Sequence, residues 1–375
     1  MRSLGEDLVF VSDLHLGDGR AELFQRDASF CRFLGALGTR ADERGRRCRL
    51  VVLGDFLDFL HVDGSGSDAE RIAVGKLERM VAAHGAVFDA LRWFCTNGGA
   101  LDVVVGNHDA DLARPAVQSA LAAALGGTAK TAPGIHRWQW HRPGEVYAEH
   151  GHQYHDINAF STVLAPWGRG TPPALEETLG AGLGHCLASR RRHSRLVLPA
   201  VLAGRAARLV DPRRHARRRA YRREILPGHG ATVGLDLATL EHLDALSART
   251  VAALPLRLGR HVLRTRAGRR PPPDRDYLAG AAAQIARILA ESRSPVGLVV
   301  MGHSHRAGQW ALGGGSAPVR YLNTGAWSSV RGGGDGLPTF VDVPGGVGTA
   351  ARLRGWSDAS DETGFVAVAA DRRGA

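Results

Sequence analysis

The sequence predicts a layered α/β protein, and three observations support this fold class. Short apolar runs recur before residue 155 and again after residue 295, and each ends in polar residues. Longer stretches with a helical spacing of apolar residues separate the early runs. A third region, residues 158–294, has no clear β-type runs and is rich in Ala, Leu and Arg. Strands that alternate with helices are typical of an α/β domain.

The elements follow from these patterns in chain order. Helices are expected at Ala21 to Leu37 and at Ile72 to Phe94, where apolar residues recur at helical spacing. Strands are expected where short apolar runs occur, at Leu8 to Val11, Leu50 to Leu53, Leu101 to Val105, Val146 to Ala148, Leu298 to Met301, Tyr321 to Leu322, Thr339 to Val343 and Gly364 to Ala369.

The change of pattern predicts three segments. Residues 1–157 and 295–375 are expected to be the two parts of one α/β domain. Residues 158–294 are expected to be an Arg-rich helical insertion or cap, interrupted by prolines that include the Pro271 to Pro273 triplet.

Composition excludes several classes of protein. The chain has 375 residues, of which 44% are hydrophobic and 23% charged, an ordinary globular mixture. Its four cysteines are far apart and form no C-x-x-C pair, which argues against a disulfide framework and a thiolate zinc site. No run of 18 apolar residues and no signal-peptide pattern is present. We therefore expect a cytoplasmic protein without a membrane span.

Side chains of the types that commonly bind metal ions follow five of the expected strands. The segments are "SDLHLG" with Asp13 and His15, "GDFLD" with Asp55 and Asp58, "GNHD" with Asn107, His108 and Asp109, "EHGHQYH" with His150, His152 and His155, and "GHSH" with His303 and His305. Residues at the carboxyl ends of strands in one sheet converge on a common crevice. Oxygen and nitrogen donors without thiolate suit Mn²⁺, Fe, Co²⁺ or Zn²⁺. The five segments together contain more donor side chains than one ion can bind.

Each motif by itself is commonly turn chemistry, because Gly, Asn and Asp tolerate the backbone angles of tight turns. Their joint occurrence, each after an apolar strand, argues against coincidence. The ordered set D-x-H, G-D-x-x-D, G-N-H-D, H-G and G-H-x-H resembles the calcineurin-like metallophosphoesterases, over roughly residues 8–155 and 296–345. The resemblance implies an α/β fold of four layers, an αββα sandwich of two mixed β-sheets flanked by helices.

The resemblance also implies a centre of two divalent metal ions, for which we expect Mn²⁺, with Fe, Zn²⁺ and Co²⁺ as alternatives. It assigns seven ligands: Asp13, His15 and His305 to the first metal, Asn107, His150 and His303 to the second, and Asp55 as the bridge between them.

The same resemblance leaves His108 unligated and facing the substrate. Two ions roughly 3.5 to 4 Å apart can share a bridging hydroxide, because they lower the pKa of the parent water towards about 7. His108 is then expected to stabilise charge on phosphorus or to protonate the leaving oxygen. Asp58 is expected to orient and charge His108, the alternative being a cap on the following helix. Asp109 is expected to be a loop or cap residue.

Three further residues have open roles. His152 either contacts the substrate phosphate or stabilises its loop, and His155 has the same two interpretations. The segment "YLNTGAW" resembles the family segment that follows G-H-x-H, in which Asn323 would fix the loop geometry.

The expected function is metal-dependent hydrolysis of a phosphomonoester, phosphodiester or pyrophosphate bond by the bridging hydroxide. Phosphoprotein phosphatases of the superfamily carry Arg and Glu where this chain has Phe59 and Asp109, which disfavours a phosphoserine substrate. Bacterial UDP-2,3-diacylglucosamine pyrophosphohydrolases are distantly similar but carry G-N-R-D. We therefore expect a phosphorylated small molecule, nucleotide-sugar or lipid headgroup as substrate. A nuclease is one alternative. A non-catalytic scaffold is the other, although its usual mark, loss of ligands, is absent here.

The net charge of +11 comes from one stretch, since Cys186 to Glu224 contains 13 Arg and only two acids. Three interpretations are open. The first is that the arginines are a solvated helix face. The second is that they form, with the apolar run Leu196 to Val210, a surface that lies on an anionic membrane. The third is that they bind nucleic acid. The last is less favoured, because Tyr221 is nearly the only aromatic residue there for stacking bases.

Overall fold

The computed structural model describes residues 5–20, 23–64, 67–155, 158–160, 163–164, 214–249, 277–312, 318–328, 336–359 and 364–368. The chain divides into two compact units, Met1–His150 with Pro295–Ala375, and Gly151–Ser294. Each is described by itself. The first unit contains both β-sheets, and its first part ends at His150, where the sequence had suggested residue 157.

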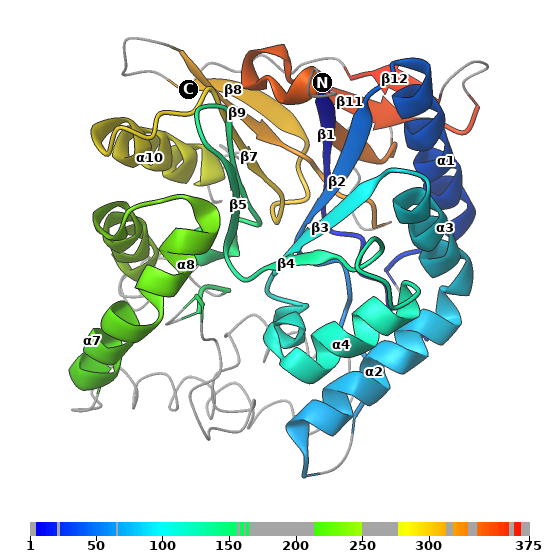
Figure 1. Cartoon of the computed structure of the whole chain (residues 1–375), viewed down its shortest axis with the longest axis horizontal. Coiled ribbons are helices and arrows are strands. Elements are labelled where there is room, and N and C mark those ends of the chain that lie inside the picture. Colours follow the sequence, from blue (N-terminus) through cyan, green and yellow to red (C-terminus); the bar gives the residue numbers. More distant parts are fainter. Residues whose placement is uncertain are drawn as a thin grey trace, which may run out of the picture. The chain divides into compact units, whose positions relative to one another are not determined.

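A seven-stranded mixed sheet runs through the first unit (Figure 1). Its strands are β1 (Glu6–Val11), β2 (Arg47–Leu53), β3 (Ala100–Val104), β4 (Gly134–His136), β10 (Thr339–Val343), β11 (Arg352–Trp356) and β12 (Phe365–Ala367). The order is β12-β11-β10-β1-β2-β3-β4. Strands β1 to β4 are parallel, so their carboxyl ends lie at the same edge. Strands β10, β11 and β12 complete the sheet in antiparallel pairs.

The second sheet has five strands in the order β5-β6-β7-β9-β8. They are β5 (Gln139–Arg142), β6 (Val146–Glu149), β7 (Leu298–Met301), β8 (Gly308–Leu312) and β9 (Val319–Asn323). Strands β6, β7 and β9 are parallel neighbours, and β5 and β8 pair antiparallel at the two edges. The carboxyl ends of β6 and β7 therefore also share an edge.

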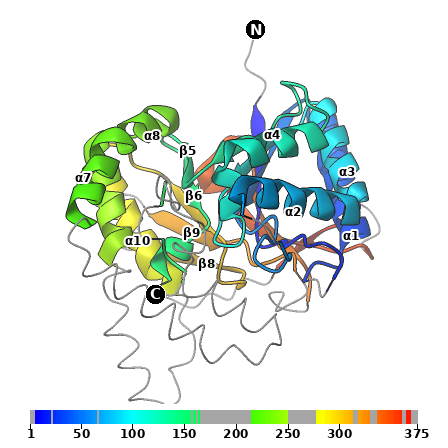
Figure 2. The ribbon, with the colours of Figure 1, turned by 90° about the horizontal axis from the view of Figure 1, so that it is seen from below.

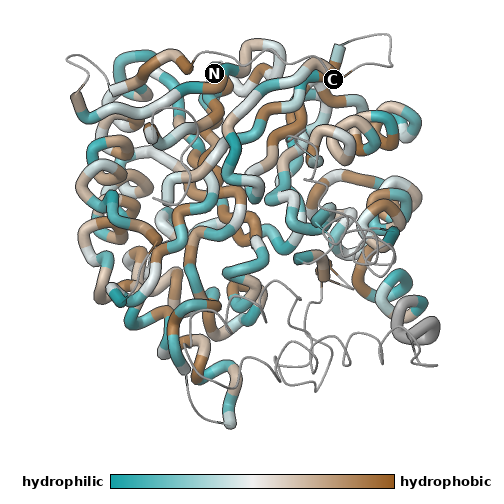
Figure 3. The backbone as a smooth tube through the Cα atoms, turned by 180° about the vertical axis from the view of Figure 1, so that it is seen from behind, coloured by the Kyte–Doolittle hydropathy of each residue, from teal (hydrophilic) through white to brown (hydrophobic). Residues whose placement is uncertain are grey.

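The two sheets pack face to face around an apolar core. Its residues alternate along the strands and come from both sheets, with Phe10, Val51 and Val104 from the first and Val300 and Leu322 from the second. Brown, hydrophobic stretches mark the central strands in Figure 3. Each fully buried side chain of this size contributes about 1.5–3 kcal/mol.

Four helices cover the other face of the seven-stranded sheet: α1 (Asp27–Glu43), α2 (Ala69–Ala83), α3 (Gly85–Thr96) and α4 (Pro115–Ala124). They lie together in both ribbon views (Figures 1 and 2). Phe33 of α1 makes ring contacts with Trp327, Phe340 and Trp356, at centroid distances of 4.9, 5.1 and 5.4 Å. This aromatic cluster joins the helical layer to the sheet.

The second unit is helical wherever its regular structure is described. It contains α7 (Arg214–Glu224), α8 (Leu226–Val233), a helix at residues 237–249, and α10 (Tyr277–Glu291). The apolar run Leu196 to Val210 and the proline triplet lie outside the described residues. Among the described helices, none combines the length and apolar character needed to cross a bilayer.

The predicted fold class, α/β with two mixed sheets, is confirmed. Two helix predictions were wrong in detail. The first helix starts at Asp27, six residues later than expected. The second prediction, Ile72 to Phe94, covers two helices, because the backbone of His84 leaves the helical region at φ −115° and ψ 34°. His84 is buried, and its Nδ1 bonds Asp27 at 2.6 Å, which holds the break in place.

Candidate metal centre

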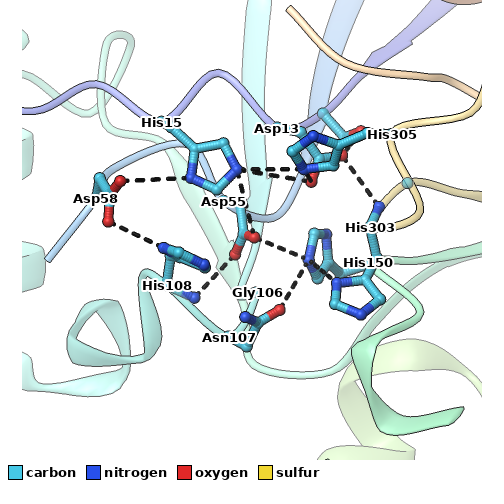
Figure 4. Close-up of polar contacts among 12 residues, drawn as sticks. Asp13, His15, Asp55, Asp58, Gly106, Asn107, His108, His150, His303 and His305 are labelled. Carbon is cyan, nitrogen blue, oxygen red and sulfur yellow. Dashed lines mark hydrogen bonds and ion pairs between the residues drawn. The ribbon is translucent and has the colours of Figure 1, made fainter. Parts of the chain in front are cut away.

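The polar side chains that follow five strands meet at one edge of the first unit (Figure 4). Asp13 and His15 follow β1, Asp55 follows β2 and Asn107 follows β3, while His150 follows β6 and the pair His303 and His305 follows β7. All seven predicted metal ligands therefore belong to the same compact unit. The shared edge results from the parallel arrangement of the strands within each sheet.

The loops after β1 and β2 run alongside each other. Backbone N–H groups of Asp13 and His15 donate to the carbonyls of Gly54 and Asp55 at 3.1 and 2.8 Å, and Leu16 forms a parallel bridge with Leu57. This pairing extends the strand register past the sheet and brings the side chains of Asp13, His15 and Asp55 together.

Unusual backbone angles are concentrated at the same residues. Six described residues other than glycine have positive φ, and five of these are predicted ligands: Asp13, His15, Asp55, His303 and His305, with φ between 51° and 62°. The sixth is Arg293. The left-handed region costs a side-chain-bearing residue about 1–2 kcal/mol. Backbone strain of this kind clusters at functional sites, where the surrounding structure holds it.

The first ligand group consists of Asp13, His15 and His305. Nε2 of His305 lies 3.0 Å from Oδ1 of Asp13 and 3.4 Å from Nε2 of His15. Asp13 is held from behind, since Oδ2 accepts the backbone N–H of His303 at 3.0 Å and the hydroxyl of Ser12. Its other oxygen, Oδ1, is buried and faces Nε2 of His305.

The second group consists of Asp55, His150 and His303, with Asn107 beside it. Nε2 of His150 lies 3.3 Å from Oδ2 of Asp55, 3.3 Å from Oδ1 of Asn107 and 3.2 Å from Nδ1 of His303. Nδ1 of His150 donates to the carbonyl of Leu53 at 2.6 Å. That bond orients the ring and directs Nε2 at the other donors, as a backbone carbonyl commonly does for a metal-binding histidine.

Asp55 connects the two groups. Its Oδ2 lies 3.7 Å from Nε2 of His15 in the first group and 3.3 Å from Nε2 of His150 in the second. Its Oδ1 accepts the backbone N–H of His108 at 2.9 Å. The carboxylate of Asp55 thus lies between the two groups, as expected for a carboxylate that bridges two metal ions.

The buried carboxylates of the site stabilise positive charge beside them. Burial lowers the pKa of His150, but Asp55 and Asp13 outweigh burial and raise it to about 10. Burial raises the pKa of Asp55, yet His150 and His108 bring it well below its usual value. The same carboxylates would stabilise a divalent cation, whose binding would displace the protons from these groups.

The described residues fit a divalent metal. The His and Asp side chains form two groups, each with ligand atoms within 4.8 Å of one another, that could hold an ion: Asp13, His15 and His305, and Asp55, His150 and His303. Ligand atoms that bind one ion at 2.0–2.2 Å and subtend 90–110° are about 2.8–3.6 Å apart, and most of the observed separations lie in this range. The donors are imidazole nitrogens and carboxylate or amide oxygens, the set that suits Mn²⁺, Fe, Co²⁺ and Zn²⁺.

His108 lies beside these groups with Asp58. Nδ1 of His108 is 2.9 Å from Oδ1 of Asp58, and burial of the ring is outweighed by Asp55 and Asp58, which raise the pKa of His108 to about 9. The alternative role of Asp58 as a helix cap is not observed, because α2 is capped by Asp68, whose side chain accepts from the N–H groups of Glu70 and Arg71.

Asp109 holds two loops together. Its buried carboxylate accepts the backbone N–H of Gly106 at 2.6 Å and that of Phe56 at 2.8 Å. It thereby ties the Asn107 loop to the Asp55 loop, a specific form of the loop role expected from the sequence. Asn323 has a similar place behind β7, where its Nδ2 donates to the carbonyl of Gly302 at 2.9 Å.

His152 and His155 belong to the second unit, which begins at Gly151. Nε2 of His152 lies 3.0 Å from Nε2 of Gln153, and its ring packs against Phe160. His155 contacts Asn158 and Tyr277. These contacts agree with a loop-stabilising role for both residues, and the phosphate contact of His152 stays a prediction.

Sequence reasoning missed two residues. Ser12 supports Asp13 and also contacts Thr324 at 2.7 Å. His61 lies 2.6 Å from Oδ2 of Asp58 through its Nδ1. The available signal for His61 was its spacing, three residues after an acid at a strand end. No protein-family profile matches the chain, and no curated protein matches it significantly.

Proposed function

We propose that this protein is a metal-dependent phosphoesterase with a dinuclear centre, which hydrolyses a phosphomonoester, phosphodiester or pyrophosphate bond. The proposed substrate is a phosphorylated small molecule, nucleotide-sugar or lipid headgroup. One observation carries the proposal: two groups of buried and half-buried His and Asp side chains are connected by Asp55 and lie beside His108, an imidazole paired with a carboxylate of its own. Turn chemistry does not require such an arrangement.

Seven side chains would hold the two ions, for which Mn²⁺ is the first choice. Asp13, His15 and His305 would bind one ion, Asn107, His150 and His303 the other, and Asp55 both. When bound, the ions supply Lewis-acid chemistry that activates water near neutral pH and offsets charge on a phosphoryl group.

His108 is the residue proposed to act on the substrate. Nδ1 is held by Asp58, while Nε2 has no hydrogen-bond partner among the described residues. Asp58 stabilises the charged form of the ring, so that Nε2 can donate a hydrogen bond to a phosphoryl oxygen or a proton to the leaving oxygen. The backbone N–H bond to Asp55 fixes the loop that carries His108.

The test begins with metal content. The purified protein should contain close to two transition-metal ions per chain after incubation with Mn²⁺ and gel filtration, measured by mass spectrometry of the metals. The loaded protein is then assayed on p-nitrophenyl phosphate, bis-p-nitrophenyl phosphate, a nucleotide-sugar and DNA, with a chelated sample as the control.

Hydrolysis of a small ester that requires the metal supports the proposal. A preference for DNA would favour the nuclease alternative. Two bound ions without hydrolysis of any substrate would favour a binding scaffold, and a chain that retains no metal would refute the proposed centre.

A further inference from the structure

The Asp58 carboxylate faces three imidazoles. Oδ1 lies 2.9 Å from Nδ1 of His108, and Oδ2 lies 2.6 Å from Nδ1 of His61 and 3.6 Å from Nδ1 of His15. Burial raises the pKa of Asp58, but the neighbouring imidazoles, above all His108, bring it well below its usual value. His61 belongs to neither ligand group proposed above.

The contact between His61 and Asp58 is a hydrogen bond. The donors of Asp58, His61 and His108 lie close enough together to suggest a third metal site. However, two ligands that bind one ion at 2.0–2.2 Å and at right angles are about 3 Å apart. The separation of 2.6 Å is instead that of a short charge-assisted hydrogen bond.

The loop that carries His61 is anchored on both sides of it. Phe59 and Val62 are buried, at 2% exposure each. Lys76 of α2 donates to the carbonyl of Phe59 at 2.8 Å, and Arg79 donates to the carbonyl of Asp63. The position of the His61 ring is therefore held by the fold as well as by Asp58.

His61 and His108 lie next to each other on the same carboxylate. Their ring centroids are 5.4 Å apart and their planes differ by 33°. Since both rings bind Asp58 through Nδ1, the Nε2 atom of each lies on the side of its ring away from the carboxylate. Within the described part of the chain neither Nε2 has a hydrogen-bond partner, and the two side chains are 31% and 20% exposed.

We propose that His61 is a second substrate-binding imidazole, which contacts a phosphoryl oxygen of the bound ester beside the one contacted by His108. The inference rests on the proposed phosphoesterase function. A phosphoryl group presents several oxygens, and a pair of side-by-side imidazoles offers a second contact at the border of the metal centre. No ligand atom proposed for either ion belongs to His61, so its removal should leave the metals bound.

The experiment measures orthophosphate binding to the Mn²⁺-loaded protein by calorimetry, together with metal content. His61→Ala should keep both ions and bind orthophosphate about tenfold or more weakly, the usual effect of losing a hydrogen bond to a charged group. His61→Gln should lose less, because the amide still offers a donor. KM for a small ester should rise in parallel with the loss of phosphate affinity.

His136→Ala is the matched control. His136 also pairs with a carboxylate, Asp102, at 3.0 Å, and its side chain is 22% exposed, but it lies outside both ligand groups. Its removal should leave orthophosphate affinity unchanged. Circular dichroism of each variant checks that the fold is intact.

A double-mutant cycle separates direct contact from an effect through His108. If His61 touches phosphate, His61→Ala should weaken binding further in a His108→Ala background. If the second substitution has no effect there, His61 acts only by positioning His108, and the proposal is overturned.

The outcomes also separate this inference from the proposed function. Wild-type protein that binds two ions and phosphate, with His61→Ala unchanged in phosphate affinity, overturns the role of His61 alone. Wild-type protein that holds no metal overturns both.

Discussion

Among the single residues of the site, Asp55 is the one whose charge serves both ligand groups. Asp55→Asn should therefore lose metal, and hydrolysis should fall by more than about 100-fold, the upper end for loss of a group that only supports a ligand. The amide oxygen can still accept the N–H of His108, which Asp55 bonds at 2.9 Å, so the substitution tests the charge more than the loop.

Metal content and turnover of the variant give the answer. Asp89→Asn is the control, because the side chain of Asp89 is 70% exposed on α3 and belongs to none of the groups that could hold a metal ion. An Asp55→Asn protein with two ions and near-normal turnover would exclude the bridging assignment.

His108 should respond differently from Asp55. His108→Ala should keep both metals and lose roughly 10²- to 10⁴-fold in rate, the range for a lost acid, base or charge-stabilising group. Metal analysis and kcat of the same preparation are compared. If the variant loses metal, His108 belongs among the ligands, close to Asp55, as one of the His and Asp groups also allows.

Single residues also show where sequence reasoning ends. The ordered motifs identified the seven predicted ligands together with Asp58 and His108, because each motif follows an apolar strand whose end must lie at the sheet edge. His61 was missed, since its relation to Asp58 depends on the course of the loop after β2 and on anchoring by α2. Only the folded backbone specifies that course.

At the level of elements, glycines let the strand-end loops approach one another. Gly54, at the end of β2, has φ +77°, and a Cβ there would lie 2.5 Å from the ring of His150. Gly54→Ala should displace His150 and lower metal affinity by at least about tenfold, the lower end for loss of support to a ligand. Calorimetric titration of the variant with Mn²⁺ measures the change in metal affinity.

Gly45→Ala separates the effect of contact from that of backbone strain. Gly45 has φ +56°, and nothing lies within 4 Å of an added Cβ. It should lose about 1–2 kcal/mol of stability, the cost of a side chain in the left-handed region, with metal affinity unchanged. If both variants bind metal normally, Gly54 is not required for the position of His150.

Two strands that sequence analysis missed have little apolar periodicity. Strand β5 reads "QWHR" and β8 reads "GQWAL", and both are edge strands, which need fewer buried residues. Strand β7, which is buried on both faces, was predicted at its observed bounds, because a strand buried on both faces consists of a continuous run of apolar residues. The break at His84 depends on its contact with Asp27, which no local pattern indicates.

At the level of the whole molecule, metal binding should stabilise the fold. Five predicted ligands have strained backbone angles, and the neighbouring carboxylates of Asp13 and Asp55 would be stabilised by bound cations. Binding at about 100 times Kd contributes about 2.7 kcal/mol for each ion, so removal of both metals should lower Tm by about 10 °C for a unit of this size. Calorimetric melting with and without EDTA tests this, and a melting curve that EDTA leaves unchanged would contradict it.

The basic helix α7 offers a separate test of membrane association. Arg219 and Arg223 are exposed, whereas Arg222 pairs with Asp244 at 3.3 Å. If this helix lies on anionic lipid, the protein should sediment with anionic vesicles, and salt should release it. Arg219→Gln with Arg223→Gln should weaken binding by up to about 2 kcal/mol, at about 1 kcal/mol per charge.

Hydrolysis of a soluble ester should be unchanged in that double variant, because neither residue belongs to the ligand set. Equal sedimentation with neutral and anionic vesicles, or with neither, would leave the solvated helix face as the better interpretation of the arginines.

The distance along the chain between the ligands affects how the protein is made. His305 contacts His15, and the N–H of His303 reaches Asp13, across 290 residues in each case. A ribosome therefore exposes Asp13, Asp55 and His150 long before it delivers the last two histidines. Contacts of such long range slow folding, and the carboxylate of Asp13 has no contact with its two histidine partners until at least 290 more residues have been added. If the proposed centre binds metal, both ligand groups can be complete only after His303 and His305 have emerged from the ribosome, so the supply of free metal from that point on would limit how much of the newly made protein becomes loaded.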